Sequence, residues 1–524
     1  MKSWQKLTVI LIFALAITSN AQSFKELFLV NIDELHFVSP VEKSVFQDFI
    51  ISGSKDYFSL FLCFDSTLTQ ADIEKYRLKL NEQVVPFTSS YYSDMNEKKK
   101  VTKIYSAIHE EMLDKYTLLV PFSSVFKTRE YHCVSSSMLY ALIFNALEIP
   151  YEIRLVPNHV YLVAYPKTQF ITVETTDPLH GALVFDGVFK AKFVEYLRDA
   201  KLVSSEEFNS KSTDVLFEEY FNRTDTIAIE ALASIQYRNK MLEELGKSRF
   251  KNACFMQEKA WLLYPDATNT YLLLNNWLVY YTGLNKNDLE AVKTLGKLSR
   301  FQSKGMPPEA IIGEFAQITQ RQLLYEGDTE LYDSSFYLLM GYITDTTLEN
   351  EIAFIYNYER GRLLCNELEY RQALPYNQMA FNLKPKNSDA KNNLILTISN
   401  IVDSEGPVER MGFVNEIAGE LPVLLEDNLF AQLRLSTYLT MVDMSFYEKN
   451  AVQGEKYLRE FEQLYPERNI KYHLLEWDIE NAYGSAASYY FRIGQNGRSQ
   501  AVLEKGLFYV PNSLTLKTRL NAVK

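Results

Sequence analysis

The chain has 524 residues, of which 47% are hydrophobic, 14% aromatic and 23% charged. This much apolar surface excludes a disordered or collagen-like chain, and the length predicts roughly two to four domains. The formal net charge of −12 argues against nucleic-acid binding, which requires a basic surface. The four cysteines are too few and too far apart for a small disulfide-stabilised scaffold.

The N-terminal segment 1–21 has the features of a secretory signal peptide. Lys2 and Lys6 precede a short apolar stretch, and small residues lead up to Ala21, where cleavage is expected. The apolar stretch is short for a bilayer span, and a single membrane anchor is the alternative interpretation. No later segment is long and apolar enough for a transmembrane helix. We therefore predict an exported protein, periplasmic or secreted, with no stable membrane span after cleavage.

One cysteine differs from the other three in its sequence context. Cys63, Cys254 and Cys365 lie in apolar or helical contexts and are predicted to be buried. Cys133 precedes three serines and a series of apolar residues at helical spacing, which predicts a helix that begins at Cys133 and ends before Pro150. We expect the serines to cap its first turn. A helix N-terminus lowers the pKa of a thiol, and its N–H groups can bind an oxyanion.

Three strand-like segments follow this helix, between residues 151 and 176. Only four residues separate the last two, which predicts a hairpin. If the apolar faces of its strands coincide, side-chain alternation places His159 and Glu174 together on the opposite face. In a regular hairpin Asp177 points away, which favours Glu174 as the partner of His159 and leaves Asp177 as the alternative acid.

Cys133, His159 and Glu174 have the types of side chain that nucleophilic thiol catalysis requires: a thiol, an imidazole that moves its proton, and a carboxylate that orients the imidazole. The motifs YHCVSSSMLYAL, PNHVYLVAY and FITVETT contain these three residues in this order. This order resembles the transglutaminase-like superfamily of papain-type thiol enzymes over residues 100–190. The resemblance implies a fold with a Cys-His-acid triad that acts on peptide or protein amide bonds.

The same motifs depart from the family pattern in two ways. Glu174 stands where the family usually has aspartate, and His132 and Val134 flank Cys133 where glycine and an aromatic residue are common. The alternative hypothesis is therefore a catalytically inactive protein–protein interaction scaffold that keeps the fold. The sequence contains no zinc-ligand spacing, dinucleotide-binding motif or complete P-loop, so we predict no cofactor and no metal.

A spacing of small residues recurs in the C-terminal half. Two small residues seven positions apart, followed five positions later by proline, occur at Ala253, Ala260 and Pro265, at Ala373, Ala380 and Pro385, and at Ser499, Gly506 and Pro511. Small residues let two antiparallel helices approach closely, and the proline ends the second helix. The spacing is typical of tetratricopeptide (TPR) repeats, and generic helices with alanine in their cores are the alternative. Gly454 and Pro466 mark a weaker repeat.

The predicted fold is an α+β N-terminal transglutaminase-like (papain-type) domain followed by an all-α TPR-like solenoid. We expect a signal peptide (1–21), a helical lead-in (22–100), the transglutaminase-like domain (101–200), a helical linker (201–230) and the solenoid (231–524). The predicted function is that of an exported thiol hydrolase or acyltransferase with a peptide or protein substrate. The concave face of the solenoid is expected to bind a protein partner.

Overall fold

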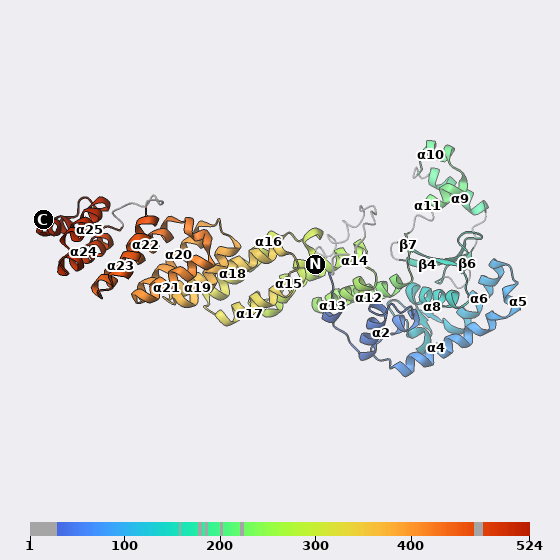
Figure 1. Cartoon of the computed structure of the whole chain (residues 1–524). Helices are drawn as coiled ribbons and strands as arrows, with labels where there is room; N and C mark the ends of the chain where they lie inside the picture. Colours follow the sequence, from blue (N-terminus) through green and yellow to red (C-terminus); the bar gives the residue numbers. More distant parts are fainter. Residues whose placement is uncertain are drawn as a thin grey trace. The chain divides into compact units, whose positions relative to one another are not determined.

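A computed structural model of the chain describes residues 29–156, 159–176, 181–183, 187–199, 203–220, 225–465 and 475–523 (Figure 1). The chain divides into two compact units, Met1–Ile311 and Ile312–Lys524. The predicted signal peptide lies outside the described residues, as does Pro466. Among the helices that are described, none combines the length and the apolar character that a membrane crossing needs.

A five-stranded antiparallel sheet forms the centre of the mixed region in the first unit. Its strand order is β6-β5-β4-β3-β7, with β3 (Tyr151–Val156), β4 (His159–Ala164), β5 (Ile171–Val173), β6 (Ala182–Leu183) and β7 (Asp225–Ile227). Leu162 of β4 lies opposite Val173 of β5, so the apolar faces of the predicted hairpin coincide. The sequence did not predict β7, which lies in the segment expected to hold only helices and pairs with β3.

Helix α8 (Cys133–Ala146) packs against β3 and β4 on one side and against α12 (Glu230–Gly246) on another (Figure 1). It begins at Cys133, as predicted, but its N-cap is His132, whose Nδ1 accepts the N–H of Val134 at 3.1 Å. The expected serine caps are therefore only partly present: the Ser135 hydroxyl accepts the N–H of His132. The helix ends before Glu148, which has a φ of +53° and turns the chain toward β3.

Short helices precede α8 and the sheet in the chain. They are α2 (Pro40–Ile50), α3 (Tyr57–Leu62), α4 (Gln70–Val84), α5 (Ser90–Ser93), α6 (Glu97–Met112) and α7 (Ser124–Lys127). Between them, β1 (Lys115–Tyr116) and β2 (Glu130–Tyr131) form a parallel pair directly before α8. Three further helices, α9 (Gly187–Asp199), α10 (Ser205–Ser210) and α11 (Thr213–Tyr220), surround a small apolar cluster of their own.

A fully buried ion pair joins the first helices of this unit to later ones. The Lys259 ammonium donates to Glu42 at 2.7 Å, and neither side chain is exposed to solvent. Glu42 also accepts the Tyr237 hydroxyl at 2.8 Å and the N–H of Val38 at 2.7 Å. Burial lowers the pKa of Lys259, and these contacts, together with the Phe37 and Tyr237 rings at 5.7 and 5.6 Å from the ammonium, compensate the two buried charges. The pair fixes α2 against α12 and α13 (Phe250–Leu263).

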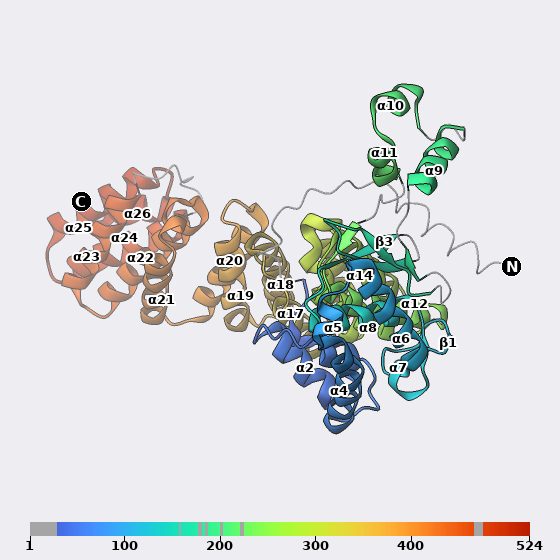
Figure 2. The ribbon, with the colours of Figure 1, turned by 90° about the vertical axis from the view of Figure 1, so that its right-hand side faces the viewer.

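The remaining helices include four pairs that are each joined by a turn of three residues. In the first unit α12 pairs with α13 and is followed by α14 (Ala267–Thr282) and α15 (Leu289–Leu298), and α16 (Pro308–Ile318) crosses the division between the units. The second unit contains α17 (Thr329–Met340), α18 (Thr346–Asn366), α19 (Tyr370–Leu383), α20 (Ser388–Ser404), α21 (Pro407–Glu420), α22 (Asn428–Tyr447), α23 (Ala451–Leu464), α24 (Glu476–Arg492), α25 (Asn496–Tyr509) and α26 (Leu514–Val523). Helices α22 to α26 pack side by side, each on its neighbours (Figures 1 and 2).

Small residues make these close helix contacts, as the spacing predicted. Ala253, Ala260, Ala373 and Ala380 are fully buried in α13 and α19. A Cβ added at Gly506 in α25 would lie 2.9 Å from the Tyr483 side chain of α24. Each predicted proline stands two residues after the end of a helix, beyond α13, α19 and α25. The described helices are therefore TPR-like repeats, a fold that implies protein–protein interaction.

Candidate active site at the start of helix α8

The structure brings the three predicted site residues together. Cys133 is a free, half-buried cysteine at the first position of α8. His159, at the first position of β4, interacts with Cys133 closely enough that its imidazole lowers the pKa of the thiol. Nε2 of His159 lies 2.8 Å from Oε2 of Glu174, which directly follows β5.

The contacts of Glu174 fix the orientation of the imidazole. Oε1 of Glu174 accepts the N–H of Thr176 at 3.1 Å and its hydroxyl at 2.6 Å. Oε2 is thus directed at His159, whose Nε2–H donates to it and whose Nδ1 remains for the thiol. Asp177, the alternative acid, lies outside the described residues. His159 is therefore hydrogen-bonded to Glu174 and interacts electrostatically with Cys133.

The charges of these three residues stabilise an ion pair at neutral pH. Burial alone would raise the pKa of the Cys133 thiol, but the neighbouring imidazoles of His132 and His159 lower it to about 6. Hydrogen bonds with Cys133 and Glu174 raise the pKa of His159 to about 9, against the effect of burial. The pKa of Glu174 is lowered, because hydrogen bonds from His159 and Thr176 outweigh its burial. Between these values Cys133 is a thiolate and His159 an imidazolium.

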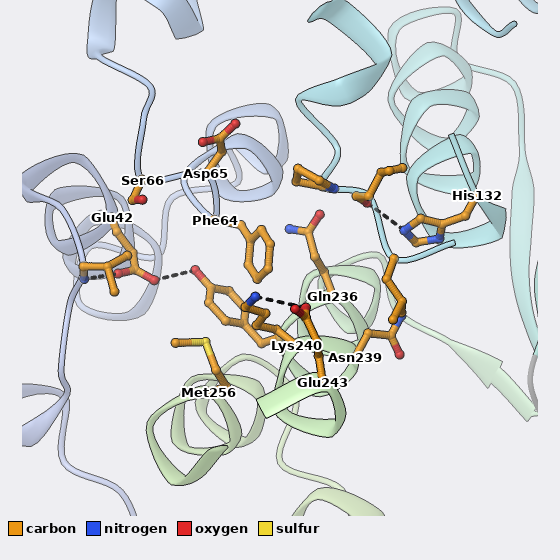
Figure 3. A pocket seen from close by; sticks show the side chains of 15 residues that line it. Glu42, Phe64, Asp65, Ser66, His132, Gln236, Asn239, Lys240, Glu243 and Met256 are labelled. Atoms are coloured by element: carbon orange, nitrogen blue, oxygen red, sulfur yellow. Dashed lines mark hydrogen bonds and ion pairs between the residues drawn. The ribbon is translucent and has the colours of Figure 1, made fainter. Parts of the chain in front are cut away.

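Two imidazoles lie beside the thiol, and their contacts differ. Nδ1 of His132 accepts the Val134 N–H, and its Nε2 lies 2.8 Å from the carbonyl oxygen of Val120 (Figure 3). Both ring nitrogens of His132 are therefore engaged with the backbone, one as acceptor and one as donor. His159 is the imidazole that can exchange a proton with Cys133.

Two serines in the first turn of α8 attach the helix to both strands of the site. The Ser137 hydroxyl donates to the carbonyl oxygen of Val160, the residue after His159, at 3.3 Å. The buried Ser136 hydroxyl lies 2.7 Å from the hydroxyl of Thr175, the residue after Glu174. These bonds hold the start of α8, and with it Cys133, against the strands that carry His159 and Glu174. The sequence showed the serines but gave no sign of their distant partners.

The backbone of Glu174 is held from the other side. Its carbonyl oxygen accepts the Tyr105 hydroxyl of α6 at 3.1 Å, and its N–H donates to the carbonyl oxygen of Gly181 at 2.8 Å. A Cβ at position 181 would lie 1.8 Å from the Tyr105 ring, so only glycine fits there. Tyr105 and Gly181 thus position Glu174, and sequence reasoning identified neither.

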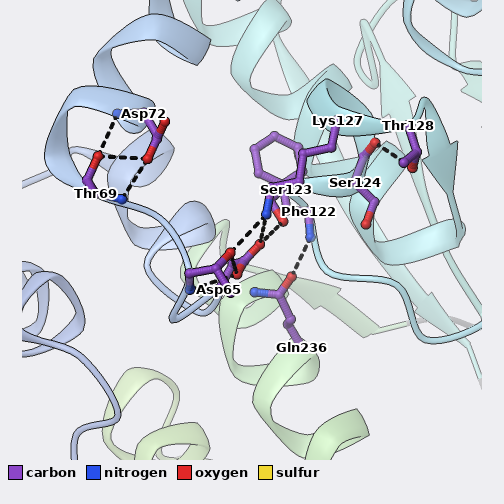
Figure 4. Close-up of polar contacts among 10 residues, drawn as sticks. Asp65, Thr69, Asp72, Phe122, Ser123, Ser124, Lys127, Thr128 and Gln236 are labelled. Carbon is purple, nitrogen blue, oxygen red and sulfur yellow. Dashed lines mark hydrogen bonds and ion pairs between the residues drawn. The ribbon is translucent and has the colours of Figure 1, made fainter.

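A polar cluster holds the chain between β1 and α8 (Figure 4). Asp65 accepts the Ser123 hydroxyl at 2.6 Å and the Lys127 ammonium at 2.7 Å. The side-chain oxygen of Gln236 accepts the N–H of Phe122 at 3.0 Å. Although burial opposes it, the contacts with Lys127 and Ser123 lower the pKa of Asp65 to about 2. The cluster joins this segment to α12.

The other cysteines have different surroundings. Burial raises the pKa of Cys63 and Cys254 well above the usual range. Cys365 is half-buried rather than buried as predicted, and its sulfur lies 3.1 Å from the Thr397 hydroxyl. Within the described ranges, no three or more histidine, cysteine, aspartate or glutamate residues form a group suited to a metal ion.

Comparisons with known proteins point to the helical repeats. No protein-family model matches the chain, and no curated protein matches it. The chain is similar to a solved tetratricopeptide repeat protein from Parabacteroides merdae ATCC 43184, with 14% identity over 55% of this chain and 98% of that one and a TM-score of 0.17. It is also similar to the APC/C hetero-tetramer Cut9-Hcn1, with 13% identity over 91% of each chain and a TM-score of 0.18.

These scores are too low to carry an argument, so the assignment of TPR-like repeats rests on the helix pairs themselves. Neither comparison supports the transglutaminase-like resemblance, which stays a prediction from the sequence.

Proposed function

We propose that the first unit is a thiol acyl-transfer enzyme that acts on peptide or protein amides, similar to transglutaminase-like enzymes, and that the helical repeats bind a protein partner. The observation that carries the catalytic part is the placement of Cys133 at the start of α8 beside His159, whose Nε2 lies 2.8 Å from the Glu174 carboxylate. The charges of these groups favour a thiolate beside an imidazolium at neutral pH, which is the reactive form of a cysteine nucleophile.

In the proposed reaction the Cys133 thiolate attacks the amide carbonyl carbon and forms a tetrahedral intermediate. The backbone N–H of Cys133 is the donor we assign to its oxyanion, since His132 already binds the N–H of Val134. The intermediate expels the amine, which takes the proton from Nδ1 of His159 and leaves a thioester on Cys133. Water or a second amine attacks the thioester, and its proton returns to His159 as the thiolate leaves.

An activated ester tests this proposal without knowledge of the natural substrate. We expect p-nitrophenyl acetate to release about one equivalent of nitrophenolate per chain in a burst, with an acetyl group on Cys133 in the mass spectrum. The steady rate should depend on pH as a bell, because the ion pair forms above about 6 and is lost above about 9. Cys133→Ala and His159→Ala should abolish the burst, and Cys365→Ala should keep it. Acetylation spread over several cysteines would contradict the proposed acyl-transfer function of Cys133.

The second candidate function is a binding scaffold without catalysis, and a groove in the second unit favours it. The groove has a volume of about 610 Å³ and lies between α20 and α22. Side-chain amides line the groove, from Asn392, Asn393 and Gln432. Exposed apolar surface is added by Leu396 and Leu429. The side-chain NH₂ of Asn393 has no hydrogen-bond partner in the part of the chain that is described. Side-chain amides both donate and accept, which suits the main chain of an extended peptide.

A peptide array tests this second function. We expect extended peptides with uncharged side chains to bind the full-length chain, and Leu396→Asp to reduce their affinity about tenfold or more. Leu514→Asp, which alters a comparably exposed leucine on α26, is the matched control and should leave affinity unchanged. Peptide binding that persists in Leu396→Asp would exclude this groove as the peptide-binding site. Peptide binding without thiol chemistry would support the scaffold, and peptide binding together with active thiol chemistry would support the first proposal.

We also propose that a signal peptide over residues 1–21 exports the protein. The domain limits that the sequence predicts remain part of this proposal. N-terminal sequencing of the protein from its native cells tests export. The expected mature protein begins near residue 22, and a chain that starts at Met1 would contradict cleavage.

A further inference from the structure

The turn before Cys133 exposes three large apolar side chains. Tyr116 of β1 is 45% exposed, Leu118 is 74% exposed and Leu119 is 54% exposed. We call residues 116–120 the apolar turn. Single exposed apolar residues are common on proteins, but three within four positions form a small continuous patch.

Hydrogen bonds at both ends hold the apolar turn beside the thiol. The N–H of Thr117 donates to the carbonyl oxygen of Tyr131 at 2.8 Å, and Nε2 of His132 lies 2.8 Å from the carbonyl oxygen of Val120. Tyr131 and His132 are the two residues directly before Cys133. The ends of the turn are therefore bonded to the two residues that precede Cys133, and Leu119 lines the same pocket as His132.

The conformation of this turn is unfavourable for folding alone. Leu119 has a φ of +60°, a left-handed conformation that costs an ordinary side chain about 1 kcal/mol or more. Its side chain and that of Leu118 gain little from burial in return. A strained backbone that displays apolar side chains at a site of chemistry indicates a role in binding.

The electrostatics of Tyr116 agree with this placement. Its pKa is raised by burial and by the negative charges of Cys133 and Glu174, so its ring lies close enough to sense both groups. The ring also packs edge-on against Tyr131, with centroids 5.8 Å apart. Tyr116 thus forms a rigid aromatic part of the same surface.

We propose that the apolar turn is the specificity surface of the Cys133 site, and that it binds a bulky apolar side chain of a peptide substrate directly beside the amide that is attacked. This inference rests on the proposed thiol chemistry. Any peptide whose carbonyl carbon reaches Cys133 must place a neighbouring side chain near Leu118 and Leu119. Burying a leucine-sized side chain against them removes apolar surface of both partners from water.

Matched peptidyl electrophiles test the inference. Short N-acylated peptidyl chloromethyl ketones with leucine, glycine or aspartate beside the reactive carbonyl alkylate Cys133, and mass spectrometry measures the rate at that residue. We expect the leucine compound to react about tenfold or more faster than the glycine compound, and the aspartate compound to react most slowly. Iodoacetamide, which has no side chain to bind, reports the reactivity of the thiol itself.

Two variants separate specificity from reactivity. Leu118→Ser should reduce the leucine-to-glycine rate ratio about fivefold or more while the iodoacetamide rate stays unchanged. Leu78→Ser, at a 65% exposed leucine of α4, is the matched control and should keep the ratio. Equal rates for the leucine and glycine compounds, with normal iodoacetamide labelling of Cys133, would overturn this inference and leave the proposed function standing. Loss of selective iodoacetamide labelling would overturn both.

Discussion

Two half-buried cysteines, one in each unit of the molecule, differ in their partners and not in their exposure. Cys133 lies beside two imidazoles, one of which is bonded to a carboxylate. Cys365 in α18 contacts the Thr397 hydroxyl at 3.1 Å and the Asn377 amide at 3.4 Å, both of them neutral groups. The difference teaches that a reactive thiol is made by ionisable neighbours held in position, and that exposure alone is a poor guide.

The largest expected effect comes from removing the imidazole. In His159→Ala the pKa of Cys133 should rise above about 6, by roughly one or more, because one of the two imidazoles that lower it is removed while burial still opposes the charge. At pH 5.5 the thiolate fraction, about a quarter in wild type, should then fall about tenfold or more. The alkylation rate should fall by a smaller factor than the thiolate fraction, because a more basic thiolate is a better nucleophile.

The pH profile of iodoacetamide labelling, resolved by residue, measures this prediction. Cys365 is the internal control and should label identically in wild type and variant. If the pH dependence of labelling at Cys133 is unchanged in His159→Ala, then His159 does not lower the pKa of Cys133. The contrast between Cys133 and Cys365 would then not depend on this imidazole.

A smaller effect is expected from the carboxylate. Glu174→Gln removes a group that raises the pKa of His159, so this pKa should fall below about 9 by roughly one. The imidazolium is then lost at lower pH. The alkaline limb of the pH–rate profile of acyl transfer should therefore shift to lower pH, and the acid limb should shift less. Rates of ester turnover between pH 6 and 10 measure both limbs. An alkaline limb at the wild-type pH would mean that Glu174 does not raise the pKa of His159.

A matched pair of threonine variants sharpens the comparison further. Thr175→Val leaves the buried Ser136 hydroxyl with one partner fewer, and should lower the free energy of unfolding by about 1–2 kcal/mol and shift the Cys133 profile slightly. Thr397→Val makes the same chemical change beside Cys365 and should have a similar cost without any shift at Cys133. Hydrogen exchange of α8 and α18 amides measures local stability. A shift at Cys133 in Thr397→Val would contradict this assignment.

The smallest expected effect concerns stability and pH. The raised pKa of His159 alone would add stability below about 6.5 that is lost as pH rises through about 9. The lowered pKa of Cys133 alone would add stability above about 9 that is lost as pH falls through about 6. Between these limits the folded ion pair holds as many protons as the neutral pair of the unfolded chain, so the two dependences cancel.

The difference in α8 stability between wild type and the double variant Cys133→Ala, His159→Ala should therefore stay constant within about 0.5 kcal/mol from pH 7 to 8.5. Hydrogen exchange at several pH values measures it. A clear slope in that difference would mean that one of the two residues titrates alone.

Part of this site follows directly from the sequence. The period-two alternation of strands placed His159 and Glu174 on one face, and the helical spacing placed Cys133 at a helix start. The bond between Ser136 and Thr175 could not be predicted, because a hydroxyl partner 39 positions away leaves no local pattern. Strand β7 escaped prediction for the same reason, since only its pairing with β3 makes those three residues a strand.

The cap of α8 and the apolar turn show a second limit. Serine is the favoured N-cap by propensity, but the imidazole of His132 takes that place because its other nitrogen bonds Val120. The φ of +60° at Leu119 runs against its residue type, and its neighbours Thr117 and Val120 are bonded to Tyr131 and His132. Sites of this kind arise where tertiary contacts override local preference.

The helix pairs share one further regularity. Three-residue turns join α12 to α13, α18 to α19, α22 to α23 and α24 to α25, and the middle residue of each has a positive φ: Ser248, Leu368, Lys449 and Gly494. Because these connectors are uniform in length and handedness, a duplicated pair would enter the chain without disturbing its phase. Such modularity lets an array of repeats be lengthened or shortened by whole pairs, because each pair contacts only its neighbours.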